Sequence, residues 1–204
     1  IPTSQSQIDI IEIVDSWKHT LKDFGLTVST GKVVDFRTKE NLRDNFDEDS
    51  CVPLLWMQNL TTSGINLYPK NFNKKRGIVV NESTRNILVP IQNYVLLKRF
   101  TSKCNRRRLY VSPFFKSQFK EFNYIGFENH LNYIHGIDRS LNIEEVRGLC
   151  ALLGSDILDI YFRAMNGSTQ VNATDLLKVP MPDYDILCKL GDNDHPDRNR
   201  ELLN

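Results

Sequence analysis

Residues 94–108 read YVLLKRFTSKCNRRR, an apolar run followed directly by a basic one. The run 94–97 has the aromatic and aliphatic content of a buried strand. The next eleven residues, Lys98 to Arg108, contain six cations with Thr101, Ser102 and Asn105 between them. The stretch therefore predicts a strand that ends in a basic, hydroxyl-rich loop, which is the donor set that phosphate oxygens and base edges require.

Basic and acidic residues are unevenly distributed along the chain. From Lys74 to Arg108 there are ten basic residues and one acid, Glu82, so this window has a net charge of +9 while the whole chain has +1. The remaining residues must then sum to −8. A basic segment of this kind attracts polyanions, and it favours nucleic acid as the partner.

A solvated charged face and a membrane-binding surface fit the basic segment less well than nucleic acid does. Most short charge runs are solvated faces, but a solvated face does not account for the strand that precedes the loop. A membrane surface would also attract cations, yet no basic amphipathic helix is present to lie on it, and no apolar run approaches the ~20 residues that span a bilayer. We expect no membrane partner and a cytoplasmic location.

Hydrophobic periodicity predicts an α+β fold. Apolar residues from Ile10 to Phe24 recur at helical spacing and stop at Gly25, which predicts one N-terminal helix. Helices are also expected from about Asn142 to Leu153 and from Ser155 to Ala164. The predicted strands are 27–34, 51–57, 65–68, 78–80, 87–89, 94–100, 109–111, 123–127 and 131–135. This order favours a twisted, mostly antiparallel or barrel-like sheet between N-terminal and C-terminal helices.

Three intervals follow from this pattern. Residues 1–25 are expected to be a linking helix, residues 26–182 the main domain, and residues 183–204 an acidic, flexible tail. The first residue is not an initiator methionine and no signal-peptide core follows it, which suggests a piece of a longer protein.

Motifs for chemistry are missing from the sequence. No GxGxxG or Walker loop is present to hold a cofactor or a nucleotide. Asp35, Lys39 and Glu40 are in the wrong order for a metal-dependent nuclease. His130 and His135 lack a third zinc ligand nearby, and the four cysteines are too widely separated for a metal site. The sequence therefore favours binding over catalysis, with no metal.

A second stretch, residues 161–182, has a more specific pattern, and we call it the specific stretch. Residues 161–182 read YFRAMNGSTQVNATDLLKVPMP, which predicts a helix end, a glycine turn, an extended polar segment, a helix capped by Thr174 and a Pro-x-Pro exit. Thr169, Gln170 and Asn172 could equally be turn residues that satisfy backbone groups. As a whole, the stretch resembles the end of the target-recognition domain in adenine-N6 DNA methyltransferases of restriction-modification systems, the TaqI-like and PstI-like group. Residues 28–37, 52–55 and 94–103 fit the same resemblance.

This resemblance implies a function for the chain. Target-recognition domains read double-stranded DNA, and the methyltransferase catalytic domain that flips and methylates the adenine with S-adenosylmethionine (AdoMet) would lie elsewhere in the same chain or in a companion chain. The Asn/Asp-Pro-Pro-Tyr motif and the glycine-rich AdoMet motif of that group are missing here. We therefore expect this chain to be non-catalytic and to hold no cofactor.

Candidate DNA-binding residues come from the basic segments and the specific stretch. Lysines would hold phosphates, while Arg99 and Arg106 are the candidates for reading guanine because a guanidinium matches O6 and N7. The full set is Lys74, Lys75, Arg76, Lys98, Arg99, Ser102, Lys103, Asn105, Arg106, Arg107, Arg108, Gln170 and Asn172.

Two main alternatives to this interpretation remain open, and a third, a nuclease acting alone, would be supported by metal-dependent cleavage by the isolated chain. The chain could be the DNA-specificity subunit of a multisubunit restriction-modification enzyme, which predicts a second recognition half in the full gene. It could also be a protein-interaction module whose basic face meets an acidic partner. Selection of one sequence from a random pool of duplexes would separate DNA recognition from protein interaction.

Overall fold

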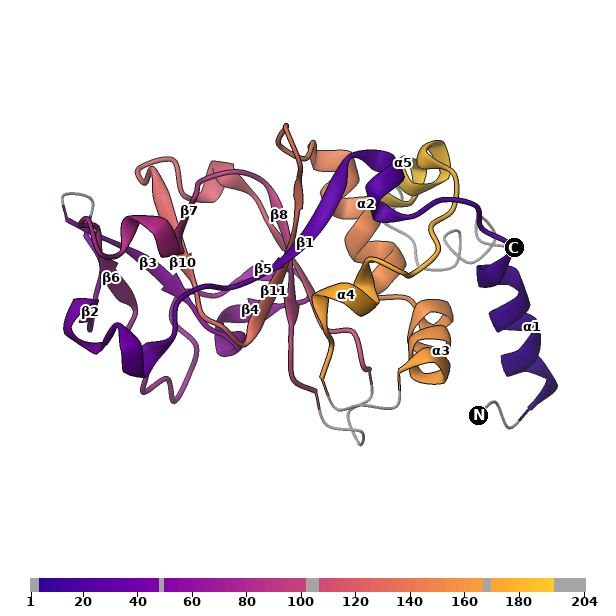
Figure 1. The fold of residues 1–204 in the computed structure, drawn as a ribbon, viewed down its shortest axis with the longest axis horizontal. Coiled ribbons are helices and arrows are strands. Elements are labelled where there is room, and N and C mark those ends of the chain that lie inside the picture. The colour runs from indigo at the N-terminus through magenta and orange to yellow at the C-terminus, as the bar shows by residue number, and fades with distance from the viewer. Residues whose placement is uncertain (1–3, 48–49, 102–106, 167–169, 193–204) are drawn as a thin grey trace.

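The computed structural model describes residues 4–47, 50–101, 107–166 and 170–192. Figure 1 shows two sheets and a group of helices arranged along the long axis of the molecule, with a five-stranded sheet at one end, a four-stranded sheet in the middle and helices at the other end. The α+β prediction is confirmed. The described strands form open sheets, so a twisted sheet describes the fold better than a barrel.

The four-stranded sheet is the central layer. It contains β1 (Leu26–Thr30), β11 (Leu131–Gly136), β8 (Tyr94–Lys98) and β9 (Val111–Phe114) in that order, and every pairing is antiparallel. Successive side chains of a strand point to opposite faces. In β8, Val95 and Leu97 therefore enter the core on the helical side, while Leu96 enters the core on the other side. Burial on both faces explains why residues 94–97 are continuously apolar.

The five-stranded sheet packs on the second hydrophobic core, which lies on the side of the central sheet away from the helices. Its order is β2 (Leu42–Arg43), β6 (Gly77–Val79), β3 (Cys51–Leu55), β10 (Tyr124–Phe127) and β7 (Leu88–Pro90). Strands β10 and β3 pair in parallel and the other pairs are antiparallel. A short hairpin of β4 (Leu60–Thr61) and β5 (Gly64–Ile65) forms a separate two-stranded sheet that contacts β9. Aromatic rings fill this core, including Tyr94 against Phe127 at 5.5 Å between ring centroids.

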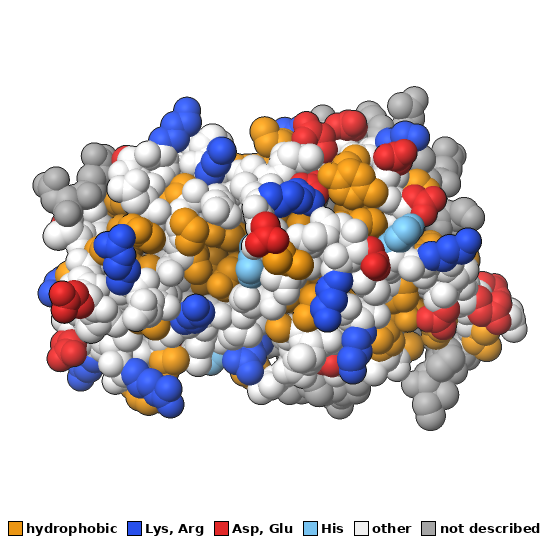
Figure 2. Space-filling view, turned by 45° about the horizontal axis from the view of Figure 1, so that its top comes forward, with side chains coloured by type: hydrophobic (Ala, Val, Ile, Leu, Met, Phe, Trp, Pro, Cys, Tyr) orange, Lys and Arg blue, Asp and Glu red, His pale blue; other side chains and the backbone are white. Residues whose placement is uncertain are grey.

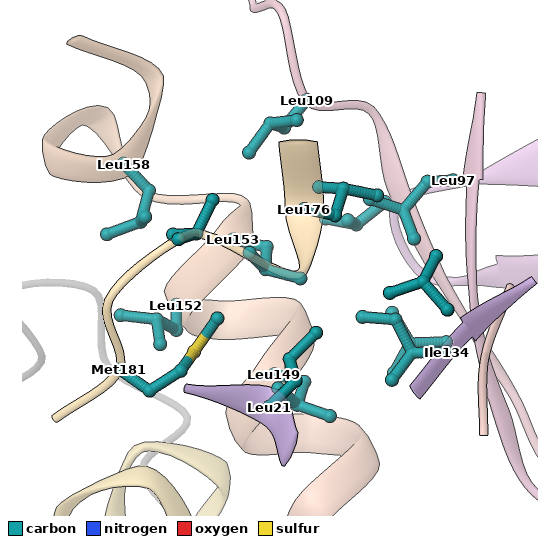
Figure 3. Packing of buried hydrophobic residues seen from close by; sticks show 14 of the residues in the cluster. Leu21, Leu97, Leu109, Ile134, Leu149, Leu152, Leu153, Leu158, Leu176 and Met181 are labelled. Carbon is teal, nitrogen blue, oxygen red and sulfur yellow. The ribbon is translucent and has the colours of Figure 1, made fainter. Parts of the chain in front are cut away.

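Helices cover the other face of the central sheet. The helices are α1 (Gln5–Asp15), α2 (Ile143–Leu153), α3 (Asp156–Met165), α4 (Ala173–Leu176) and α5 (Tyr184–Asp192). Of these, α2 and α4 contact the strands, whereas α1 packs on α3 and α5 packs on α2. Short 3-10 turns occur at Leu21–Phe24, Asp35–Arg37, Lys39–Asn41, Met57–Asn59, Arg85–Ile87 and Lys116–Gln118. Figure 3 shows leucines of α2 and α3 facing Leu97 and Ile134 of the sheet, with Met181 among them.

The caps of α2 and α3 confirm the predicted boundaries of these helices. Asn142 accepts a hydrogen bond from the backbone of Glu145 at 2.7 Å, and Ser155 accepts one from Leu158 at 3.2 Å. The short helix α4 begins after Asn172 rather than after the predicted Thr174.

The N-terminal region differs from its prediction. The apolar spacing predicts a single helix to Gly25, but α1 ends at Asp15, where the hydroxyl of Ser16 bonds back to the carbonyl of Ile13 at 2.6 Å. His19 then pairs with Met181 as an isolated β-bridge, and a 3-10 turn leads to Gly25. Tertiary pairing with residue 181 thus interrupts a stretch whose apolar spacing is helical throughout.

The predicted flexible tail also differs. Residues 184–192 form α5, which packs on α2 and buries Leu187 and Leu190 in the core. There is no room for a side chain at Gly148, because its Cβ would overlap the carbonyl oxygen of Leu187. The many acids of the interval hid this apolar face, and residues 193–204 lie outside the described residues.

Candidate nucleic-acid interface

The basic loop after β8 has a closed base. Thr101 and Arg108 face each other there, with the Thr101 hydroxyl donating to the Arg108 carbonyl at 3.0 Å. The Arg108 guanidinium donates to the Thr101 carbonyl and hydroxyl at 2.8 and 2.9 Å, and its backbone N–H donates to Asp159 of α3. These bonds fix both ends of the loop to the helical layer.

The position of Arg108 argues against its predicted DNA contact. The side chain is 2% exposed, and burial, together with the nearby charge of Arg163, lowers its pKa. A guanidinium held in this way closes the loop instead of meeting a phosphate. The sequence could not reveal this, because Arg108 follows two other arginines and its burial depends on α3.

Arg107 lies nearer the surface. Its Nη2 pairs with Asp156, the first residue of α3, at 2.9 Å, and about a third of its side chain is exposed. Ser102, Lys103, Asn105 and Arg106 were also predicted to bind DNA, and they lie outside the described residues. Their role stays a prediction.

Four segments meet beside the end of β8. The Arg99 N–H donates to the His130 carbonyl at 2.8 Å, and the Val171 N–H donates to the Arg99 carbonyl at 2.8 Å. Phe100 and Gln170 form a β-bridge, and Val33 forms another with Glu128. In Figure 1 the chain leaving β8 and the chain entering α4 run side by side below the sheets.

We call this surface the basic band and define it as residues 31–35, Lys74, 98–101, 128–130 and 170–172. Lys74 joins it through Asp35, since the Lys74 Nζ lies 3.5 Å from an Asp35 carboxylate oxygen. The structure therefore brings together two basic segments that lie more than twenty residues apart in sequence. Lys32, exposed within the band, was not among the predicted site residues.

The two cations at the end of β8 are held differently. The Lys98 ammonium lies 3.7 Å from the centroid of the Tyr110 ring, and burial lowers its pKa. The Arg99 guanidinium donates to the carbonyl of Asn129 at 3.2 Å and keeps partial exposure. Arg99 is thus anchored at the band with donors to spare, because a guanidinium has five N–H groups.

The three cations of the second basic segment, residues 74–76, have different surroundings. Lys74 lies over the Trp56 ring at 4.9 Å, at the band, while Lys75 pairs with Asp44 at 2.8 Å. Arg76 stacks on Tyr68 and Phe72 at 5.6 and 5.4 Å from the ring centroids. Of the three predicted phosphate contacts, Lys74 is the one that the structure joins to the basic band.

The two polar residues of the specific stretch have structural roles as well. The Asn172 amide donates to the carboxylate of Asp175 at 3.0 Å, and the Gln170 carbonyl accepts from Asn166 at 3.1 Å. The buried Asn132 of β11 donates to the carbonyl of Val171 at 2.6 Å. These bonds lock residues 170–172 against the central sheet, as expected of turn residues, and they leave a DNA contact of Gln170 and Asn172 as a prediction.

Sequence reasoning missed a histidine–carboxylate pair. His130 Nδ1 lies 2.5 Å from Glu128 Oε1, and the His130 N–H donates to Glu128 Oε2 at 3.0 Å. The carboxylate is 2% exposed and the imidazole side chain is 46% exposed. Burial raises the pKa of Glu128, although bonds from His130 oppose the shift. The spacing Glu-x-His in a turn between two strands was the available signal.

The zinc interpretation gains no support from these positions. His130 is bound to Glu128, whereas His135, near the other end of β11, lies 2.9 Å from the hydroxyl of Ser29. In the part of the chain that the structure describes, no three His, Cys, Asp or Glu side chains come close enough together to hold a metal ion. Within the same residues, no helix is long and apolar enough to cross a membrane.

Charge is unevenly spread over the face that Figure 2 shows. Figure 2 shows acidic side chains gathered toward the end formed by the helices, while lysine and arginine side chains extend into both halves. On this face a polyanion would therefore be favoured over the sheets rather than over the helical end.

Two curated relatives match most of the chain. The type II methyltransferase M.PstI of Providencia stuartii is 39% identical over 182 residues, which cover 89% of this chain and 36% of that protein. The type II methyltransferase M.BsuBI of Bacillus subtilis is 40% identical over 173 residues, 85% of this chain and 34% of that protein. The resemblance to PstI-like methyltransferases is thereby confirmed, and the chain spans about a third of the length of these relatives.

Solved structures share the fold at low sequence identity. The type IIG restriction endonuclease BpuSI matches with a TM-score of 0.59 and 12% identity, over 97% of this chain and 28% of that chain. A chain of a type I restriction-modification system matches with a TM-score of 0.51 and 11% identity, over 98% of this chain and 46% of that chain. No protein-family profile matches the sequence.

Proposed function

We propose that this chain is a target-recognition domain that binds double-stranded DNA at a specific sequence. The chain is homologous to about a third of the length of the restriction-modification methyltransferases M.PstI and M.BsuBI. The observation that carries the proposal is the basic band, where contacts of residues 31–35 and 128–130 link two separate cationic segments. Lysines there neutralise phosphates and set the register, and Arg99 is the residue best placed to enter a groove.

Catalysis is assigned to another part of the longer protein. The sequence of this chain lacks both the glycine-rich turn for AdoMet and the motif that receives a flipped adenine. We infer that the catalytic domain, with AdoMet as methyl donor and adenine N6 as the acceptor, lies in the remaining two thirds of proteins of this kind or in a companion chain. The acidic helical end would then be free to face that domain.

The test of DNA binding is a salt titration of the whole chain with a labelled duplex of 20 to 30 base pairs. Lys74→Ala and Lys32→Ala should each lower the log-log salt slope by roughly one, because each removes one phosphate contact. Lys22→Ala is the matched control, since Lys22 is an exposed lysine in the 3-10 turn at the helical end.

Two results would overturn the proposal. One is failure of the chain to bind duplex at low salt. The other is an equal loss of slope in Lys22→Ala and in the two band variants, which would mean that binding follows net charge alone and needs no particular surface.

A further inference from the structure

His130 and Glu128 form a hydrogen-bonded pair within the basic band. The Glu128 carboxylate is buried and accepts from both the ring and the backbone of His130. A carboxylate in this position fixes the imidazole orientation and the protonation of Nδ1. Among the described residues, no group hydrogen-bonds the other ring nitrogen, Nε2, on this half-exposed side chain.

The pair has two charge states. When Nε2 is unprotonated and Nδ1–H faces the carboxylate, the pair carries −1; when Nε2 takes a proton from solvent, the pair is neutral. Burial disfavours a negative charge at this position and raises the pKa of Glu128. A negative pair at the centre of a surface for a polyanion would oppose binding.

We propose that His130 is a proton-dependent DNA contact, which takes up one proton when duplex binds and donates from Nε2–H to an acceptor atom of the DNA. This inference rests on the proposed DNA-binding function and goes beyond it, because it assigns a residue and a proton to the interface. The acceptor is a phosphate oxygen or a base-edge acceptor, which share the same hydrogen-bonding chemistry.

The other charged groups around the pair act in opposite directions: the cations of Lys32, Lys74 and Arg99 disfavour a positive charge on the imidazole, whereas the carboxylate of Asp35 favours it. Lys32 and Asp35 lie on the segment bridged to Glu128, Lys74 partly neutralises Asp35, and Arg99 is bound to Asn129 and His130 by its side chain and backbone. The nearby carboxylate of Asp35 raises the pKa of Glu128 further. In contrast, DNA phosphates would add many negative charges next to the imidazole and favour its protonated form.

The experiment measures duplex affinity of the whole chain from pH 6 to pH 8.5 at fixed ionic strength. We expect affinity to fall as pH rises, by up to about tenfold per pH unit for one linked proton. His130→Gln should remove this dependence. His135→Gln is the matched control, because His135 lies on the same strand and bonds Ser29 instead of a carboxylate.

Glu128→Gln tests the sign of the effect. It removes the negative charge of the pair, so affinity at pH 8 should rise several-fold while the pH dependence above pH 7 shrinks. Thermal unfolding of each variant checks that the domain is intact. If Glu128→Gln does not fold, proton uptake by the parent chain, measured directly as duplex is added, gives the same information.

The outcomes are separable. Absence of duplex binding at every pH would overturn the proposed function itself. Binding without proton uptake, or a pH dependence that survives His130→Gln, would overturn this inference and leave the proposed function standing. If His130→Gln weakens random and selected duplexes equally, the acceptor is a phosphate; if it relaxes selection at one position, the acceptor is a base.

Discussion

Arg108→Ala separates a structural arginine from a DNA-binding one. The substitution removes the two bonds from Nη1 to Thr101, at 2.8 and 2.9 Å, and leaves a buried carbonyl without its donor. An unsatisfied buried group costs about 1–3 kcal/mol, and the two lost methylenes add about 1.5 kcal/mol at ~0.8 kcal/mol each. We expect the free energy of unfolding to fall by about 3 kcal/mol.

Urea unfolding measures this loss, which should lower the midpoint by about 1 M or more at a typical slope of 1–3 kcal/mol per M. Lys74→Ala is the control and should change stability by less than about 1 kcal/mol, because its ion pair is partly exposed. The folded Arg108→Ala variant should keep the parental slope of log duplex affinity against log salt concentration. A stable variant that loses one unit of slope would refute the structural role, since that is the signature of a lost phosphate contact.

Three further predictions concern single positions. Lys75→Ala should weaken DNA binding less than Lys74→Ala, for selected and random duplexes alike, because Lys75 pairs with Asp44 away from the band; competition binding measures both. Gly148→Ala should lower the melting temperature and expose α5 to protease, since overpacking costs roughly 1–3 kcal/mol; an unchanged melting temperature would mean that α5 does not pack on α2. Burial raises the pKa of Glu145, but hydrogen bonds from Arg139, Asn142 and Tyr184 lower it by more, so that the pKa lies below its usual value. The parent chain should therefore be more stable than Glu145→Gln above pH 4.5, and this difference should disappear as the pH falls below 4.5. Urea unfolding at several pH values would test this.

Local patterns predicted most of the fold. The β8 run, the caps Asn142 and Ser155 and the strand at 131–135 all appear where their residue types indicated. These features are encoded within a few residues, because period, capping and turn chemistry act over short distances. The two-residue strands β2 and β4 were missed, since their length gives no period to read.

The site was less predictable than the fold. Charge clustering selected Lys74 and Arg99, which the structure links within the basic band, but it could not show that Arg108 is buried or that Lys75 pairs with Asp44. It also missed His130, which pairs with a buried carboxylate and accepts a backbone hydrogen bond from Arg99, a residue far away in sequence. Burial and long-range pairing are tertiary properties, so residue type alone does not reveal them.

Selection from a random pool of duplexes tests the central claim most directly. The whole chain is incubated with the pool at moderate salt, and bound duplexes are recovered, amplified and sequenced over several rounds. Sequence-specific recognition through the basic band predicts that one short motif is enriched, and that Arg99→Ala relaxes the preference at one position of it. Salt-sensitive binding with no enriched motif would contradict the claim and favour a basic module that meets acidic partners without reading DNA.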